Sequence, residues 1–358
     1  MVAQPDSIDA WVRLLLFPRC TLQVYRPKNR QEYRSRNKKS LQQSSILKSL
    51  AMWGGGGDDD FTTLVKSILD VSALGSFGQG GGNFLEEGAT GNTNIKQCLR
   101  KVADGHFTAA INVLSSSGVA SYYDDTIKTL EAKHPYKPPP SMPSITYSKP
   151  PLVAEIDSVF SCIKSFPKGT SCERDGLRVQ HILDALCGER SATATDLLKV
   201  ITSVVNLWLA GRCLPILAEF VASAPLTPLL NPDNGIQTIA VGTIWRRLVS
   251  KVSMKGVGKE MSKYLSDFQF RVRVSGGAEA ILHILNQVLS EYHHDGSLTM
   301  LTVDFSNVFN LVDRPALLHE VRVKCPSTSL WVDFFIWAGI GIVYRRHTYL
   351  VCHWGAAR

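Results

Sequence analysis

The sequence predicts an α+β fold in which helices predominate and the N-terminal region is poorly ordered. Amphipathic helical patterns follow one another from residue 152 to residue 295, two strand-like runs flank the turn sequence at 231–235, and a further apolar run ends at Asp304. Residues 1–93 instead combine a basic run with Ser/Gln-rich and Gly-rich sequence. Sequence of this kind is typical of disordered segments, so we expect residues 1–93 to be largely disordered.

A proline-rich stretch divides the chain. The sequence HPYKPPPSMPSITYSKPP occupies residues 134–151, and proline at this density fits neither a helix interior nor a strand ladder. We therefore place a linker at 134–151, preceded by a short helical segment at 94–133.

The elements beyond the linker follow from periodicity and turn chemistry. Helices are predicted at 153–166, 175–186, 195–211, 245–265, 277–292, 314–325 and 328–343. The runs at 222–230 and 236–241 are predicted to form a hairpin through NPDNG. The run SLTMLTVDF, 297–305, is predicted to be a strand.

The charge balance favours a polyanionic partner. The chain has 39 Lys and Arg against 31 Asp and Glu, and its pI is near 9.0. Seven of the basic residues lie in RPKNRQEYRSRNKK, residues 26–39, which is either a solvated arm or a phosphate-binding segment.

The cysteines and the apolar runs indicate in which cellular compartment the protein is expected. Eight cysteines include no Cys-x-x-Cys pair, so neither a zinc ribbon nor a disulfide framework is indicated. No apolar run is long enough to span a bilayer. We expect the protein in the cytoplasm or nucleus, with no membrane partner.

The stretch LTVDFSNVFN, 301–310, raises the question of catalysis. Asp304 is predicted at the end of an apolar strand, where a metal-dependent phosphoryl transferase needs a carboxylate on a rigid element. Taken alone, an Asp in this position is more often a turn or helix-cap residue than a metal ligand.

Four blocks in order resemble the reverse transcriptase of non-LTR (LINE-type) retrotransposons, of a plant-like kind. The blocks are DGLRVQHI, PLTPLLNPDNGIQTIAVGTIWRRLVSK, FQFRVRVSGGAEAILHIL and LTVDFSNVFNLVD, and the resemblance runs from about 153 to 335. It implies a right-hand polymerase, with helix-rich fingers over 152–295 and an incomplete palm over 296–335. It also implies an RNA template, a DNA primer, deoxynucleoside triphosphates and Mg²⁺.

The resemblance assigns roles to individual residues. Asp304 would be the first of three catalytic, metal-binding aspartates, and Phe309 would lie beneath the incoming sugar, with Phe305 beside the nucleotide. The basic residues Arg246, Arg247 and Lys251 would lie near the template or triphosphate. Their alternative interpretation is the solvated face of a helix.

Asp175 and Gly176 match the turn that opens the fingers, and Gln269 with Phe270 matches the block before the palm.

Three departures from the family pattern predict an inactive chain. Gln237 stands where the family has an arginine, so the charge that would stabilise a leaving pyrophosphate is missing. Arg271 replaces a glycine, and a side chain there strains the loop. The 358 residues stop before the paired-aspartate block, so the second and third catalytic aspartates are absent from the sequence.

The tail at 336–358 no longer resembles the family. Read one nucleotide later, its codons permit Tyr-Gly-Gln near 336 and Thr-Gly-Val-Gln-Gln-Gly near 353, so we hypothesise a frameshift near residue 335. Two other interpretations of the chain stay open. It is either a nucleic-acid-binding protein without catalysis or the decayed product of a pseudogene without selected function.

Overall fold

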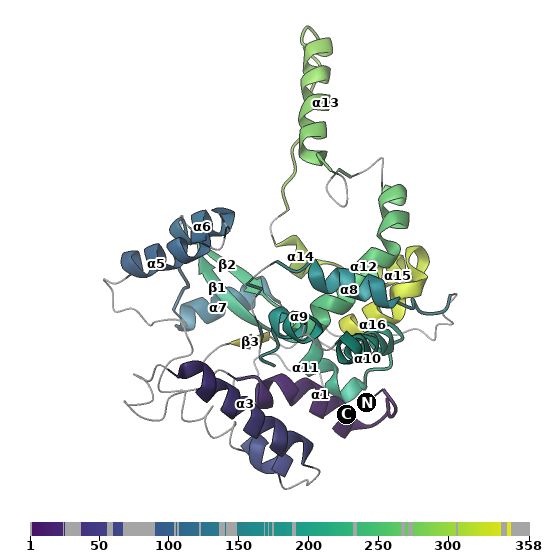
Figure 1. Ribbon diagram of the computed structural model, residues 1–358. Helices are drawn as coiled ribbons and strands as arrows, with labels where there is room; N and C mark the ends of the chain where they lie inside the picture. The colour runs from purple at the N-terminus through teal and green to yellow at the C-terminus, as the bar shows by residue number, and fades with distance from the viewer. Residues whose placement is uncertain are drawn as a thin grey trace.

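The structure is a computed structural model of the chain (Figure 1). It describes residues 2–23, 25, 37–55, 60–66, 90–103, 105, 107–121, 123–135, 140, 149–167, 169–170, 172–173, 175–187, 191–231, 235–265, 269–270, 275–305, 307–337 and 342–344. Most of the proline-rich linker and most of the basic run at 26–39 therefore lie outside the described residues.

The centre of the molecule is a set of packed helices. They are α8 (Ile156–Lys164), α9 (Val179–Leu186), α10 (Ser191–Leu209), α12 (Ile244–Leu265) and α16 (Ser329–Trp337), with the short η2 (Pro215–Leu217) and α11 (Ala218–Ala222) beside them. Trp208 of α10 is fully buried, and its ring centroid lies 5.5 Å from Trp245 of α12 and 6.3 Å from Trp331 of α16. The apolar periodicity that predicts these helices is also what builds the core.

The prediction of disorder is wrong for the first helix. Residues Ile8–Thr21 form α1, whose N-terminus is capped by Ser7 Oγ, which accepts from the Ala10 amide at 3.3 Å. Trp11 is fully buried and stacks on Trp208 with ring centroids 5.7 Å apart. Burial of an aromatic ring of this size stabilises a helix that its local composition alone does not predict.

Helix α3 (Lys38–Gly54) is a second ordered element within the region expected to be disordered. Trp53 near its end packs edge-on against Phe17 of α1 and Phe61, with centroids 5.6 Å and 5.2 Å away. An aromatic cluster thus ties α3 to α1.

The segment at 94–133 contains helices, as its pattern predicts, and residues 115–121 between them are not helical. Helices α5 (Thr90–Ala103) and α6 (Phe107–Leu114) form a pair that stands at one side of the molecule (Figure 1), and α7 (Asp124–Lys133) follows.

The predicted hairpin is present. Strand β1 (Ala224–Leu230) pairs antiparallel with β2 (Ile236–Ala240), with Leu226 opposite Ala240 and Leu230 opposite Ile236. A third strand, β3 (Ile342–Tyr344), pairs in parallel with β1, which gives the order β2-β1-β3. Part of the tail beyond residue 335 therefore belongs to the sheet, and residues 345–358 lie outside the described residues.

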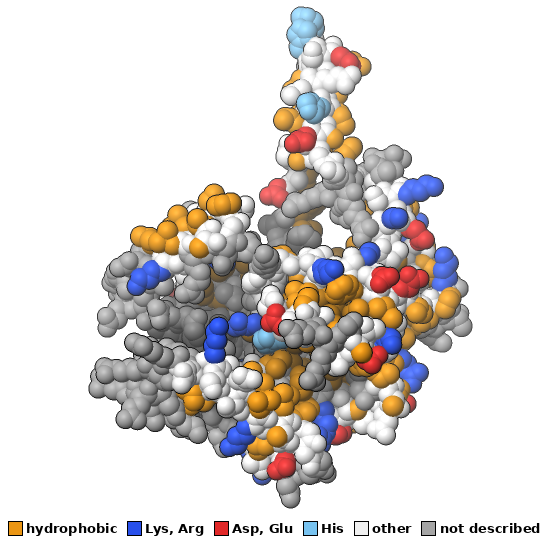
Figure 2. Space-filling model, viewed as in Figure 1, with side chains coloured by type: hydrophobic (Ala, Val, Ile, Leu, Met, Phe, Trp, Pro, Cys, Tyr) orange, Lys and Arg blue, Asp and Glu red, His pale blue; other side chains and the backbone are white. Residues whose placement is uncertain are grey.

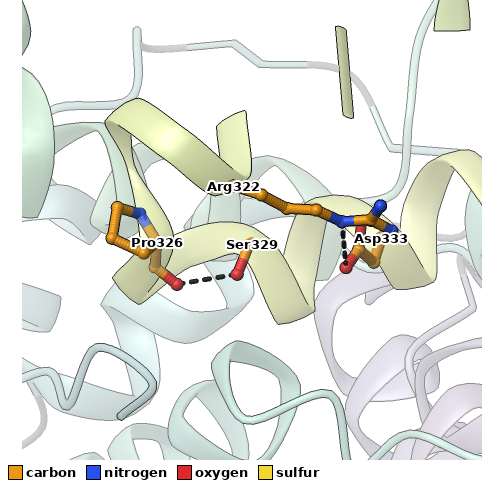
Figure 3. A network of polar contacts seen from close by, with 4 residues as sticks. All are labelled: Arg322, Pro326, Ser329 and Asp333. Carbon is orange, nitrogen blue, oxygen red and sulfur yellow. Dashed lines mark hydrogen bonds and ion pairs between the residues drawn. The ribbon is translucent and has the colours of Figure 1, made fainter. Parts of the chain in front are cut away.

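A buried ion pair joins the last two helices (Figure 3). Arg322 of α15 (Arg314–Lys324) places its Nη2 2.9 Å from Oδ1 of Asp333, which is 4% exposed in α16. Between these helices, η3 (Pro326–Thr328) leads into α16, and Ser329 Oγ donates to the Pro326 carbonyl at 2.7 Å. Both oxygens of Asp333 accept from Arg322 Nε as well, so the pair holds α15 against α16.

The predicted strand at 297–305 is not a strand in the structure. Residues 298–305 carry no sheet pairing, and Met300, Leu301, Val303 and Phe305 are 58–85% exposed. Apolar residues on both faces suit a strand buried inside a sheet, and the three described strands do not pair with this run. The run stays unpaired because no described segment supplies the backbone groups of a neighbouring strand.

Helix α13 (Gly277–Tyr292) has the predicted bounds and projects away from the rest of the molecule (Figure 1). It begins after Gly276, whose φ is 66°, and a Cβ at Gly277 would overlap the carbonyl of Phe270. Glycine is therefore required where the chain enters this helix. None of the helices within the described residues is both long and apolar enough to cross a membrane.

Candidate functional site

Asp304 lies on an exposed, unpaired stretch of backbone rather than on a strand end. The chain turns shortly after it, at Asn307, which has a left-handed φ of 56° and precedes the single-turn helix α14 (Val308–Leu311). Among the described residues, no three His, Cys, Asp or Glu side chains come together as a metal site. One carboxylate supplies too few oxygens for the octahedral shell of Mg²⁺, so Asp304 by itself cannot complete the site that the resemblance implies.

Of the two aromatic residues predicted at the nucleotide, the structure describes the side chain of Phe305 but not that of Phe309. Phe305, next to Asp304, is 70% exposed and contributes little to a closed pocket. Phe309 belongs to α14, and its side chain lies outside the described residues.

The turn after Asp304 lies near the hairpin through the end of α7. Asn307 Nδ2 donates to the Lys133 carbonyl at 2.6 Å, and the Lys133 ammonium in turn donates to the Ile236 carbonyl of β2. His134 Nε2 lies 3.2 Å from Thr238 Oγ1, also on β2. Two blocks of the sequence-predicted site, around Asp304 and on β2, are therefore joined by residues that the sequence reasoning did not single out.

These contacts place the Lys133 ammonium and the His134 imidazole at the two residues that flank Gln237, the position at which the resemblance expects an arginine. Burial, with a smaller contribution from Lys133, lowers the pKa of His134, so the imidazole is mainly neutral near pH 7. Lys133 carries a permanent positive charge, but its ammonium already donates to the Ile236 carbonyl of the β2 backbone.

Arg246 is a structural residue, not a solvent-facing one. Its guanidinium lies 4.1 Å from the centroid of the Phe335 ring, and its Nη1 donates to the Ala222 carbonyl at 2.8 Å. Burial lowers its pKa to about 10. These contacts join α12 to α11 and α16, so the predicted role at the template or triphosphate is not favoured by its position.

Arg247 also turns towards the protein, beside the loop that precedes α9. Desolvation lowers the pKa of Arg247, whereas Glu173, Asp175 and Cys172 act in the opposite direction. Asp175 is only 1% exposed, and its Oδ1 accepts from the Leu177 amide at 3.2 Å. The turn at 175–176 is thus fixed from inside by a buried carboxylate and a neighbouring guanidinium.

Lys251 lies one helical turn beyond Arg247 and shares its contact with the Phe166 ring. Its ammonium donates to Ser165 Oγ at 3.0 Å and lies 4.9 Å from the centroid of the Phe166 ring. All three basic residues predicted at the site, Arg246, Arg247 and Lys251, therefore interact with other groups of the protein.

The exposed cations of α12 are further along the helix. Lys255, Lys259 and Lys263 are spaced four residues apart and are all exposed, so they lie on successive turns of one side of the helix. Figure 2 shows Lys and Arg side chains on the surface of the molecule. We call these three residues the lysine face. The signal was present in the sequence as a four-residue spacing that continues from Lys251. Like charges at this spacing repel one another, and a polyanion would relieve that repulsion.

Comparisons with known proteins identify no relative. No protein-family model matches the chain, and neither a curated protein nor a solved structure is significantly similar to it. The case for a function therefore depends on the residues and geometry of the chain itself.

Proposed function

We propose that this chain is a fragment of an RNA-directed DNA polymerase of the non-LTR retrotransposon type, comprising the fingers and the start of the palm. In this proposal it binds nucleic acid but does not catalyse nucleotide addition. The observation that carries the proposal is the connection from Asn307 through Lys133 to β2, which brings the Asp304 block and the fingers hairpin together. The resemblance requires these two blocks to meet at the incoming nucleotide.

The exposed run at 298–305 supports the same proposal. Leu298, Met300, Leu301, Val303 and Phe305 leave apolar surface on both sides of an extended segment. Such a segment suits the central strand of a palm sheet, whose neighbours would have to come from other residues.

The lysine face is the proposed contact with the nucleic-acid backbone. Its ammonium groups are compact point charges that bind phosphate without reading sequence. The basic run at 26–39 would add to this contact, although most of it lies outside the described residues.

The same geometry argues against catalysis by this chain alone. Within the described part of the chain, Asp304 belongs to no group of three or more His, Cys, Asp or Glu side chains that could hold a metal ion, and Gln237 offers no charge to a triphosphate. We expect purified protein with Mg²⁺ to extend no primer on an RNA template. Template-dependent synthesis that is lost in Asp304→Ala would overturn this part of the proposal.

Nucleic-acid binding is tested by salt dependence. Fluorescence anisotropy with a labelled RNA–DNA hybrid is measured over a range of salt concentrations for the wild type and for K255E/K259E. We expect the slope of log K against log salt to fall by about two, because each lost phosphate contact removes roughly 0.9 from it.

A matched control changes the same net charge elsewhere. In K128E/K199E both lysines come from exposed i,i+3 pairs, with Asp125 at 4.0 Å and Asp196 at 3.0 Å. An equal loss of slope in the control would show that overall charge, not the lysine face, governs binding.

The second candidate function is nucleic-acid binding by a protein with no polymerase ancestry. The lysine face favours this candidate equally, because it needs no catalytic carboxylate. The two are separated by adding a deoxynucleoside triphosphate. Only the polymerase proposal expects the nucleotide to protect the region around Asp304 and β2 from hydrogen exchange.

A further inference from the structure

The helix pair α5–α6 carries an apolar face that no described element covers. Ile95, Leu99 and Val102 recur at i, i+4 and i+7 on α5 and are 41–62% exposed. Phe107, Ile111 and Leu114 repeat the spacing on α6 and are 54–65% exposed. Figure 2 shows these side chains as a continuous hydrophobic patch over the pair. A stripe of this width on each helix is the pattern of a helix that packs against another helix.

The charge beside this face has one sign. Lys96 directly follows Ile95, and Lys101 directly precedes Val102, so cations border the apolar stripe on both sides. Helices α5 and α6 contain no Asp or Glu. A suitable occupant is therefore an amphipathic helix with acidic character.

Helix α13 has the complementary properties. It contains Glu279 and Glu291 and no Lys or Arg. Its apolar residues Ile281, Leu282, Ile284 and Leu289 are 45–55% exposed, and the helix projects from the body of the molecule (Figures 1 and 2).

The two surfaces also agree in length. From Ile95 to Val102 the stripe on α5 rises about 10 Å, and from Ile281 to Leu289 that on α13 rises about 12 Å, at 1.5 Å for each residue.

We propose that α13 of one copy docks on the α5–α6 face of a second copy, and that the exchange is reciprocal. The resulting homodimer is isologous, with two identical interfaces related by a two-fold axis. Each interface buries the apolar stripe of α13 between those of α5 and α6, and sets the two glutamates of α13 among the lysines of α5. If the α5–α6 pairs of two copies packed against each other instead, the lysines of the two α5 helices would come together and repel. Helix α13 is therefore the favoured occupant of this face.

Sedimentation velocity of the full chain over a range of concentrations tests dimer formation. We expect a wild-type dimer, and we expect L282Q/I284Q to raise its Kd by about 100-fold or more, because both interfaces lose the same apolar contacts. Leu282 and Ile284 are already exposed within one copy, so the substitutions leave the core intact. Ile216→Gln, at another exposed apolar position that is 72% exposed, is the control and leaves the dimer unchanged.

Reversing the charges on α13 and on α5 tests whether these two helices contact each other. The variant E279K/E291K places positive charge on both sides of the interface. The variant K96E/K101E makes α5 net negative, opposite an α13 that is also acidic. Each variant alone is therefore expected to be monomeric. Mixed in equal amounts, the two variants restore both attractive contacts and form a heterodimer.

The outcomes are distinct. A wild-type chain that stays monomeric, or a mixture of the two charge variants that stays monomeric, overturns the proposal. Both results would be expected if α13 docked on the α5–α6 pair of its own copy. A dimer that survives L282Q/I284Q also overturns it, because the copies would then meet through another surface.

Discussion

The strongest test of the structure is Asp175→Asn, because Asp175 is a carboxylate buried without full compensation. Its Oδ1 accepts from the Leu177 amide, while its Oδ2 is buried with no hydrogen-bond partner among the described residues. Burial raises the pKa of Asp175 from 3.8 to about 6, although the Leu177 hydrogen bond and the charge of Arg247 act to lower it. The folded chain therefore holds this proton more tightly than the unfolded chain does.

The sign of the pH dependence follows from that difference. Between about pH 4 and pH 6 the unfolded state has released the proton and the folded state still holds it, so the wild type loses stability as pH rises. A difference of about two pKa units at 1.36 kcal/mol each gives about 3 kcal/mol as an order of magnitude. The Asp175→Asn variant has no such titration. We expect its stability relative to the wild type to increase by about 3 kcal/mol from pH 4 to pH 7.

Urea unfolding of both proteins at intervals between pH 4 and pH 7.5 measures this quantity. The buried amide of the variant adds a pH-independent penalty of about 1–3 kcal/mol, so the slope with pH carries the information rather than the difference at one pH. Asp125→Asn, at a fully exposed side chain, is the control and should change stability by less than about 0.5 kcal/mol at any pH. A stability difference between Asp175→Asn and the wild type that does not change with pH would contradict this prediction, because it would mean that water or another group compensates Oδ2.

Two further predictions concern the buried cations. Arg322→Met should cost about 3–5 kcal/mol in urea unfolding, because it removes the guanidinium that compensates the charge of the buried Asp333, and Asp333→Leu in the same chain should recover most of that loss. Arg246→Met should cost about 2 kcal/mol through the lost hydrogen bond to Ala222 and the lost contact with Phe335, yet leave the salt dependence of RNA–DNA binding unchanged. A fall in that salt slope would place Arg246 at the nucleic acid after all.

Elements with local signals are predictable from the amino-acid sequence alone. The bounds of α13 follow from its apolar periodicity and from the glycines at its start, Gly276 and Gly277, and the β1–β2 hairpin follows from two apolar runs on either side of Asn-Pro-Asp-Asn-Gly. Both signals depend on residues within a few positions of one another, and so they are readable without knowledge of the fold.

Features that depend on residues far apart in the chain are fixed by tertiary packing. Whether α1 is ordered depends on Trp208, nearly 200 positions away, against which Trp11 stacks. Whether 298–305 is a strand depends on neighbouring backbone that the described residues do not provide. Arg246 points inward because Phe335 and the Ala222 carbonyl receive it, while the more exposed Lys255 and Lys259 were not singled out. Sequence pattern reports which residues share a face of a helix, but the direction of that face is fixed by the packing of the whole chain.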